Sequence, residues 1–573
     1  MEWTYTTIVS RAAVLCLAGF AVCQPLPPAA RNTAASVAYV GSETCGGCHT
    51  KILESFRRTG MGRSMSVPHN MPLLEAARRK SRRFTSERLG RTFEVFVEDG
   101  DLYQSESRTD ANQLIFKTTY RLDYAVGSGD HGVTFITRRG GHLFQAPLSL
   151  YSRTGDWDLS PGYEHADYGF NRPIHAACLV CHSGQPRPVA ERNGAYHDPP
   201  FRELAIGCEN CHGPGALHVK ERAQGRARTP DTSIVNPARL GARLAENICM
   251  NCHQTGDARV LQPGKDYSDF RPGTWLSDTL AIFKARTAAA DTDLLEHHSA
   301  MKDSRCFIAS RGRLSCMTCH DPHVAVGPEE APAYYRARCL TCHTDAGCRL
   351  PALAREPQND CAGCHMPKRD AAVISHTALT NHRIIVRVGQ GAPATVSPSQ
   401  PELEYMNAPP GRSQAIPRLT LLKAYGEIIG RHPEFQSHYV ALLDQLSRTM
   451  PDNAFVESAL GRKLLYDAPG EATNLRAIEH LEKAVKLGAR TASVQQDLAE
   501  ALARLNRLDE SIDHLKTALE IEPYDPVLHK TLALRLIALK KYPQALEAMR
   551  RYVELFPEDD FMRSLLEKAA VAR

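Results

Sequence analysis

The middle of the chain reads Gly207-Cys208-Glu209-Asn210-Cys211-His212-Gly213-Pro214-Gly215, and its central five residues form the pattern Cys-x-x-Cys-His. This pattern occurs seven times. The first cysteines of the copies are Cys45, Cys178, Cys208, Cys249, Cys316, Cys339 and Cys361. The second cysteines are Cys48, Cys181, Cys211, Cys252, Cys319, Cys342 and Cys364. The histidines that follow are His49, His182, His212, His253, His320, His343 and His365.

The pattern is typical of a c-type haem attachment site. Each of the two thiols forms a thioether with one vinyl group of the haem, and the adjacent histidine becomes the proximal ligand of the iron. A single copy could equally be a zinc knuckle, a redox dithiol or a chance match. Seven copies, with no Cys-x-x-Cys that lacks its histidine, exclude these alternatives. The sequence therefore predicts seven covalently attached haem c groups.

Four of the 18 cysteines lie outside the motifs. Cys16 and Cys23 belong to an apolar stretch near the N-terminus, which leaves Cys306 and Cys348. A disulfide between these two would be stable outside the cytoplasm. Two buried free thiols agree with the sequence equally well, so both interpretations stay open.

The first residues resemble a secretory signal peptide, which we place at residues 1–31. Arg11 precedes an apolar run from Ala12 to Val22, which is too short to span a bilayer comfortably. Cys23 is a poor match to a lipoprotein cysteine, and we favour cleavage without lipid attachment. No later segment has 18 uninterrupted apolar residues, so we expect no transmembrane segment in the mature chain. Haem c is attached outside the cytoplasm, and we therefore expect a periplasmic or extracytoplasmic protein.

The composition is that of a globular protein. Of the 573 residues, 43% are apolar and 23% are charged, and the mean hydropathy is −0.34. This length predicts two or more domains. The net charge of +5 does not indicate nucleic-acid binding, because the propionates of the haems would offset most of it.

The chain divides into parts with different patterns. Residues 32–175 hold the first motif and a β-rich insert, in which 93–103 reads as a hairpin around Asp99-Gly100. The alternation over 133–148, around Gly140-Gly141, repeats this pattern. Residues 176–385 carry six motifs, which are too closely spaced for a large hydrophobic core made of side chains alone. We therefore expect the porphyrins to form the core, with short helices and loops wrapped around them. Residues 386–415 are rich in proline and glycine and read as a linker.

Residues 416–573 are helical and repetitive. Leu498 recurs as Leu532, and Ala499 as Ala533, each 34 residues later. Pro523 and Pro557 share this offset, which is the tetratricopeptide period. An ordinary helical bundle is the alternative, which the repeated matches disfavour. The expected fold class is thus mainly α: a haem-packed multihaem core with a small β-rich insert, followed by an α-helical tetratricopeptide solenoid that binds a protein or peptide partner.

The haem region resembles the multihaem cytochromes c related to hydroxylamine oxidoreductase and its tetrahaem electron acceptor. The matching strings are 126–131 (Val-Gly-Ser-Gly-Asp-His), 159–163 (Leu-Ser-Pro-Gly-Tyr), 207–218, 316–323 and 376–384. The chain looks still more like periplasmic cytochromes of this group that carry C-terminal tetratricopeptide repeats. The resemblance covers most of the chain and implies electron transfer more firmly than any particular reaction.

Distal ligands are expected mainly among the remaining histidines. Motif context and the resemblance point to His131, His218, His298, His323, His376 and His382. His297 is the rival of His298. His323 is expected to reach a neighbouring haem rather than its own. Met61 stands where related proteins have a histidine, with Met65 as its rival. Both methionines could instead be core residues, with the haem five-coordinate or bound by another histidine.

Two functions remain. The first is a carrier that relays electrons between periplasmic redox partner proteins. The second is a multihaem oxidoreductase that acts on a small nitrogen or sulfur compound at one open haem. All seven motifs end in histidine, so the lysine that often marks the open haem of nitrite reductases is missing. This favours the electron carrier, and no catalytic residue is proposed.

Overall fold

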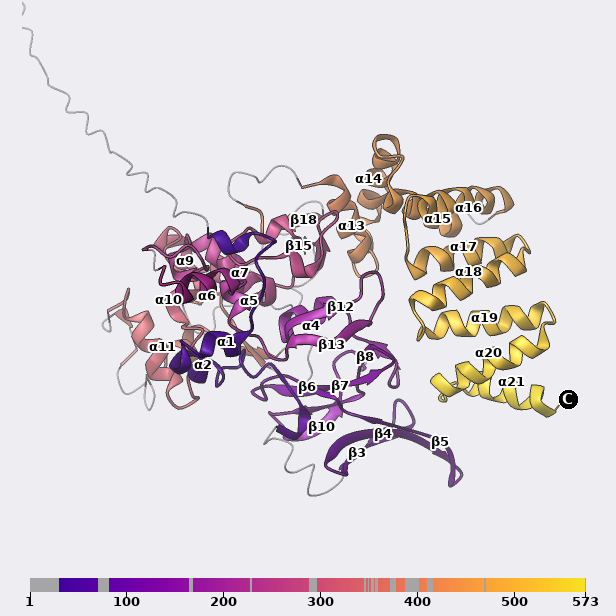
Figure 1. Ribbon diagram of the computed structural model, residues 1–573, viewed down its shortest axis with the longest axis horizontal. Coiled ribbons are helices and arrows are strands. Elements are labelled where there is room, and N and C mark those ends of the chain that lie inside the picture. Colours follow the sequence, from indigo (N-terminus) through magenta and orange to yellow (C-terminus); the bar gives the residue numbers. More distant parts are fainter. Residues whose placement is uncertain are drawn as a thin grey trace, which may run out of the picture.

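The computed structural model has three parts: a β-rich N-terminal part, a region of short motif-bearing helices, and a C-terminal stack of helices (Figure 1). The described residues are 30–70, 82–163, 168–226, 229–287, 296–344, 347–348, 350–351, 355, 359–370, 378–386, 401–409, 416–467 and 470–571. The predicted signal peptide lies almost wholly outside them, as does His376. The helical stack (α13–α21) lies on one side of the molecule, and the motif helices α9–α11 lie on the opposite side.

The β-rich part follows the first motif, which begins in α1 (Ser42–Gly46) and ends with His49 just before α2 (Thr50–Phe56). It has two antiparallel sheets. The seven-stranded sheet consists of β1 (Met65–Ser66), β6 (Tyr124–Val126), β7 (Gly132–Arg139), β8 (His142–Gln145), β9 (Leu148–Tyr151), β10 (Asp156–Leu159) and β11 (Arg172–Pro173). The four-stranded sheet consists of β2 (Arg82–Ser86), β3 (Arg91–Glu98), β4 (Asp101–Asp110) and β5 (Gln113–Arg121).

Both predicted hairpins are confirmed. β3 pairs with β4 across Asp99 and Gly100, whose φ angles are 49° and 86°. Two successive residues with positive φ match the twist of a two-residue hairpin, and aspartate-glycine tolerates that conformation best. β7 pairs with β8 across Gly140-Gly141 in the same way.

One apolar core joins the two sheets. Phe93 and Val95 of β3 pack in the same cluster as Phe135 of β7 and Leu148 of β9, and all four are buried. Each such side chain stabilises the fold by about 1.5–3 kcal/mol relative to its exposed state. The β-rich insert therefore has a side-chain core of its own.

The motif region consists of short helices, as predicted. They are α4 (Ala176–His182), α5 (Glu209–His212), α6 (Ala216–Ala223), α7 (Ala242–His253), α8 (His297–Lys302), α9 (Arg305–Ser310), α10 (Cys316–Cys319), α11 (Ala331–Cys339) and α12 (Cys361–His365).

Strand pairs run between these helices, a feature that the sequence did not predict. They are β12 (Gly184–Pro188) with β13 (Tyr196–Glu203), β14 (Ala258–Leu261) with β15 (Leu280–Arg286), and β16 (Lys368–Asp370) with β17 (Ala378–Thr380). In the stretch expected to be a linker, Glu402–Tyr405 forms β18, which pairs with β15.

The C-terminal part is a stack of antiparallel helices. They are α13 (Arg418–Ile428), α14 (Gln436–Thr449), α15 (Ala454–Asp467), α16 (Glu471–Lys486), α17 (Ala492–Arg504), α18 (Leu508–Ile521), α19 (Pro526–Ala538), α20 (Tyr542–Leu555) and α21 (Asp560–Val571). α17 and α19 begin 34 residues apart, as do α18 and α20. The recurring residues Ala499 and Ala533 are fully buried where helices touch. The fold is a helical-repeat solenoid, as the 34-residue period predicts.

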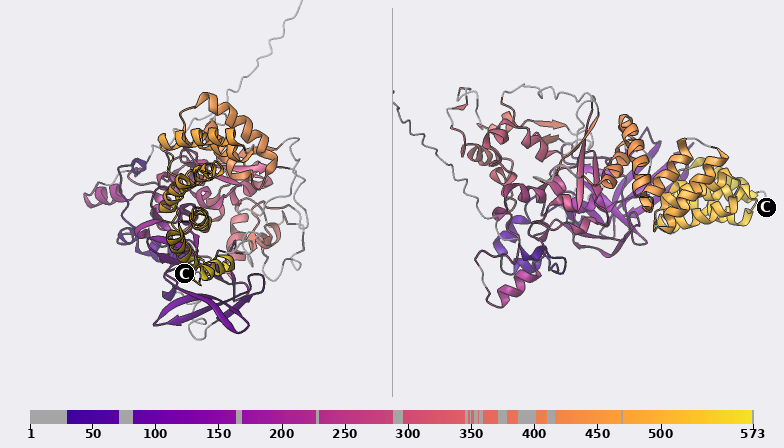
Figure 2. Two further views of the ribbon diagram at one scale, coloured as in Figure 1. Left: turned by 90° about the vertical axis from the view of Figure 1, so that its right-hand side faces the viewer. Right: turned by 90° about the horizontal axis from the view of Figure 1, so that it is seen from above.

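Both ends of the solenoid contact the rest of the molecule. At its N-terminal end, Ala424 and Ile428 of α13 pack against Val260 and Phe283 of β14 and β15. At its C-terminal end, Tyr524 packs edge-on to Phe144 of β8 with ring centres 4.8 Å apart. Here Asn171 also donates a 2.6 Å hydrogen bond to the Leu555 carbonyl. Figure 2 shows the stack extending away from the motif region.

Across the described ranges, helices that are both long and apolar enough to cross a bilayer are absent.

Candidate haem-binding core

Each motif forms about one helical turn. In the first motif the His49 N–H donates to the Cys45 carbonyl over 2.9 Å. The same bond spans 3.0 Å in the third motif, from His212 to Cys208, and in the fifth, from His320 to Cys316. Residues three and four apart share a face of a helix. Two thiols and one imidazole therefore project from the same side, as attachment to a single haem requires.

The motifs meet through their thiols. The thiol of Cys45 in the first motif lies beside that of Cys208 in the third, and each shifts the pKa of the other. Equivalent thiol contacts join the second motif to the fourth, the fourth to the fifth, and the sixth to the seventh. These contacts are Cys181 with Cys252, Cys249 with Cys316, and Cys339 with Cys361.

Two further interactions connect these groups of motifs. Cys211 of the third motif interacts electrostatically with Cys249 and Cys252 of the fourth. Cys319 of the fifth motif interacts in the same way with Cys339 and Cys342 of the sixth. All seven motifs therefore belong to one continuous cluster, and neighbours in space are often not neighbours in sequence.

The spacing of histidine rings tests whether this cluster fits haem. An imidazole nitrogen lies about 2 Å from its metal and the ring centre about 1 Å further, so two imidazoles on opposite sides of one iron have centres roughly 6 Å apart. The rings of His212 and His323 have centres 6.0 Å apart, with planes 21° from parallel. His320 and His382 are 6.2 Å apart. His253 and His297 are 5.5 Å apart, with planes 14° from parallel. These pairs fit haems held between two histidines.

Burial keeps these imidazoles neutral. It lowers the pKa of His212, His253, His320 and His382, and it lowers the pKa of His297 to about 3 with help from His382 and His253. A neutral ring keeps the nitrogen lone pair that a metal needs. The buried Nε2 of His297 has no hydrogen-bond partner among the described residues, as expected of a nitrogen that binds a metal.

Backbone carbonyls orient several of the histidines. The Nδ1 atoms of His212, His365 and His382 lie 2.9, 2.7 and 3.0 Å from the carbonyl oxygens of Val235, Ile385 and Thr380. A ring that donates from Nδ1 presents Nε2 to the metal. The sequence could not reveal these partners, because any residue type supplies a carbonyl.

His298 is placed differently from the expectation. Its Nε2 lies 3.2 Å from Glu246 Oε2, and both side chains are buried. Its Nδ1 has no hydrogen-bond partner within the described part of the chain. The ring of the rival, His297, stacks on that of His382 with centres 4.1 Å apart and lies 5.5 Å from that of the proximal His253. The neighbouring positions on α8 thus have separate partners, a carboxylate for one and an imidazole for the other.

The turn that carries His131 lies beside the segment that carries Met61. Arg63 donates to the Ser128 carbonyl over 3.0 Å and forms an ion pair with Asp130 at 3.0 Å. Met61 is half-buried, whereas His131 is exposed. The structure brings the two candidates into one neighbourhood, close to the first motif.

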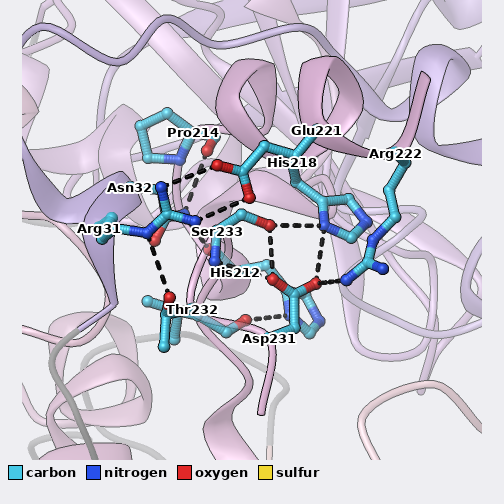
Figure 3. Close-up of polar contacts among 11 residues, drawn as sticks. Arg31, Asn32, His212, Pro214, His218, Glu221, Arg222, Asp231, Thr232 and Ser233 are labelled. Atoms are coloured by element: carbon cyan, nitrogen blue, oxygen red, sulfur yellow. Dashed lines mark hydrogen bonds and ion pairs between the residues drawn. The ribbon is translucent and has the colours of Figure 1, made fainter. Parts of the chain in front are cut away.

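His218 has a carboxylate partner (Figure 3). Its Nδ1 lies 3.0 Å from Asp231 Oδ2 and 3.1 Å from Ser233 Oγ. Both partners contact the same ring nitrogen, so this is not a serine–histidine–aspartate catalytic triad, and Nε2 is left for a metal. Burial raises the pKa of Asp231, but hydrogen bonds from Ser233 and Arg222 outweigh this effect and hold it well below its usual range. Asp231 was not predicted from the sequence.

Cys306 and Cys348, the two cysteines outside the motifs that lie within the described residues, both carry free thiols. Cys306 is half-buried; burial raises the pKa of its thiol and the nearby Cys342 raises it further. Cys348 is exposed. The two thiols are thus free in the structure, but they are not both buried as the second interpretation expected.

Comparison with known proteins finds a distant relative for part of the chain. Over 216 residues, 36% of its length, the chain is 23% identical to the multiheme cytochrome MtrA of Shewanella baltica (strain OS185). The match spans 57% of that relative, less than two thirds of its length. No protein-family model matches the chain.

Among solved structures, helical-repeat proteins are similar to about a quarter of the chain. One is YrrB, a TPR protein with an unusual peptide-binding site, at 16% identity and a TM-score of 0.24, covering 28% of this chain and 77% of that one. Another is TTC0263, a thermophilic TPR protein from Thermus thermophilus, at 17% identity and a TM-score of 0.21, covering 28% of this chain and 92% of that one.

Proposed function

We propose that this protein is a heptahaem c-type cytochrome that transfers electrons in the periplasm. The observation that carries the proposal is the continuous cluster of all seven motifs, joined by thiol contacts such as Cys45 with Cys208 and Cys249 with Cys316. Haems attached there would lie near one another. Haem c supplies the reversible iron(III)/iron(II) couple, and a relay needs such groups close together and rigidly held.

The protein's own residues would attach and orient each haem. The motif cysteines form the thioethers and the motif histidines are the proximal ligands. For the distal ligands we propose His323 opposite His212, His382 opposite His320, and His297, in place of His298, opposite His253. His131, His218, His376 and Met61 remain the candidates for the other haems. Six-coordinate irons exclude substrate and favour electron transfer over catalysis.

The partial similarity to a multiheme cytochrome supports this function. The finer resemblance to the hydroxylamine oxidoreductase and tetrahaem acceptor group is part of the proposal. We place the protein in the periplasm because haem c is attached outside the cytoplasm and the N-terminus resembles a signal peptide.

We assign the solenoid to partner docking. Helical-repeat solenoids offer extended surfaces to protein or peptide partners. Contacts at both ends hold this solenoid in place, through Ile428 against β14 and β15 of the motif region and through Tyr524 against β8 of the β-rich part. A redox protein bound there would be tethered to the chain that carries the haems.

The test is to purify the oxidised protein, count haems per chain by intact mass, and record visible and electron paramagnetic resonance spectra. Seven low-spin haems are the expected result. Fewer haems would overturn the count. A high-spin signal from about one haem in seven, shifted by nitrite or hydroxylamine, would overturn the carrier function in favour of an oxidoreductase with one open haem.

A further inference from the structure

Among the oriented histidines, His218 differs in the partner of its Nδ1. His212, His365 and His382 donate to neutral backbone carbonyls. His218 instead lies 3.0 Å from the carboxylate of Asp231. The exposed fractions of the two side chains are 21% and 18%, so water screens this contact weakly.

The carboxylate is held in place from two other directions (Figure 3). Ser233, which is fully buried, donates to Asp231 Oδ1 from its backbone N–H over 2.8 Å and from its hydroxyl over 2.6 Å. Arg222 forms an ion pair with Oδ2. Arg222 lies one helical turn after His218 on α6. One short helix therefore carries both the ligand candidate and the cation that partly neutralises the Asp231 carboxylate.

The helix itself is anchored by a second ion pair. Glu221 is buried and accepts hydrogen bonds from Arg31 over 2.8 and 2.7 Å. Because α6 and Asp231 are both anchored, the distance between His218 and the carboxylate is set by the fold rather than by the histidine side chain.

We propose that Asp231 is a positioning residue that lowers the reduction potential of the haem bound by His218, relative to that haem with a neutral partner on the histidine. This inference rests on the proposed function. A carboxylate that accepts the Nδ1 hydrogen bond makes the imidazole a stronger electron donor and fixes its tautomer. A more basic ligand and a nearby negative charge both favour iron(III) over iron(II), and hydrogen bonds to axial ligands are among the means by which proteins tune haem potentials.

The experiment is a redox titration of the full-length haem-loaded protein, followed by visible absorption, with haem content checked by intact mass. Asp231→Asn keeps the size and an acceptor oxygen but removes the charge. We expect about one seventh of the absorbance change to move to higher potential, and one low-spin resonance signal to shift. Arg222→Gln removes the opposing cation, so the same fraction should move to lower potential.

Asp321→Asn is the matched control. Asp321 lies 3.3 Å from His323 Nδ1, but its side chain is 45% exposed, and we expect a smaller shift than for Asp231→Asn. Unchanged titrations in both Asp231→Asn and Arg222→Gln, at full haem content, would overturn the inference.

His218→Ala separates this inference from the proposed function. A high-spin signal from one haem supports ligation by His218. If all haems stay low-spin in His218→Ala, the inference fails while the electron-transfer proposal stands. If the wild-type protein carries no haem, the proposed function itself fails.

Discussion

The imidazole rings of His212 and His323 lie with their centres 6.0 Å apart and their planes 21° from parallel. His212 is the histidine of the third motif, and His323 lies three residues after the end of the fifth motif. The backbone carbonyl of His323 accepts a 2.7 Å hydrogen bond from Ser55 of α2, just after the first motif. The first, third and fifth motif regions thus meet at this histidine pair. Such closeness is needed if His323, which follows the fifth motif, is to bind the haem of the third.

Removing His323 should open one haem. In His323→Ala we expect about one haem in seven to become high-spin, because His212 alone remains on that iron. Electron paramagnetic resonance and the visible spectrum of the oxidised protein measure this. His514→Ala, in the solenoid and 2.7 Å from Gln495, is the control and should leave every haem low-spin. An unchanged spectrum in His323→Ala would show that His323 is not a ligand.

His297 and His298 offer a comparison between adjacent positions. His297→Ala should convert one haem to high-spin, since His297 stands 5.5 Å from His253. His298→Ala should leave the haem spectrum unchanged and lower stability by about 1–3 kcal/mol, because it leaves the buried Glu246 carboxylate without its imidazole partner. Visible and electron paramagnetic resonance spectra of the two variants measure the spin state of the haems, and urea unfolding of His298→Ala measures its stability. A high-spin haem in His298→Ala, with an unchanged spectrum in His297→Ala, would instead identify His298 as the ligand.

The features that could be predicted from the sequence are those with a local signature. The 34-residue offset that relates Ala499 to Ala533 predicted the solenoid, because each repeat needs a small residue where helices touch. Asp99-Gly100 predicted its hairpin, because that dipeptide suits a turn with two positive φ angles.

The features that could not be predicted depend on contacts between distant segments. β18 pairs with β15 from within a proline-rich stretch, and a strand that is held by a partner from elsewhere in the chain needs no strong pattern of its own. The choice between His297 and His298 depended on which side of α8 meets the fourth motif. Asp231 has no motif, because its role arises only when its loop is folded against α6.

The solenoid should lose stability when a buried leucine is shortened. Leu498 of α17 is 1% exposed and packs in a cluster with Leu481 and Leu502. Leu498→Ala should lower the free energy of unfolding of the solenoid by about 2–5 kcal/mol, from lost burial and the cavity left behind. Leu534 of α19 is 39% exposed, and Leu534→Ala should cost about 0.5 kcal/mol or less. Urea unfolding followed by far-ultraviolet circular dichroism measures the stability of both variants. Equal losses of stability would contradict the burial of Leu498 in this cluster.

Asp559 connects the last two helices of the solenoid. Its Oδ1 accepts a 3.0 Å hydrogen bond from the Met562 N–H at the start of α21. Its Oδ2 accepts bonds from the Lys530 ammonium over 2.7 Å and the Tyr552 hydroxyl over 2.8 Å. Burial raises the pKa of Asp559, but the bonds from Lys530, Met562 and Tyr552 outweigh burial and lower it from its ordinary value of 3.8.

The stabilisation from Asp559 should therefore depend on pH. Below pH 3.8 the unfolded chain binds this proton more readily than the folded protein, so stability falls as the pH drops through the lowered pKa, and the full effect is present above pH 3.8. At pH 7 we expect Asp559→Ala to cost about 1–2 kcal/mol, and less as the pH is lowered below 3.8. Asp513→Asn, which affects a side chain 77% exposed, is the control and should change stability little at either pH. Urea unfolding at both pH values measures the difference, and a cost for Asp559→Ala that does not shrink in acid would show that the charge of Asp559 contributes nothing.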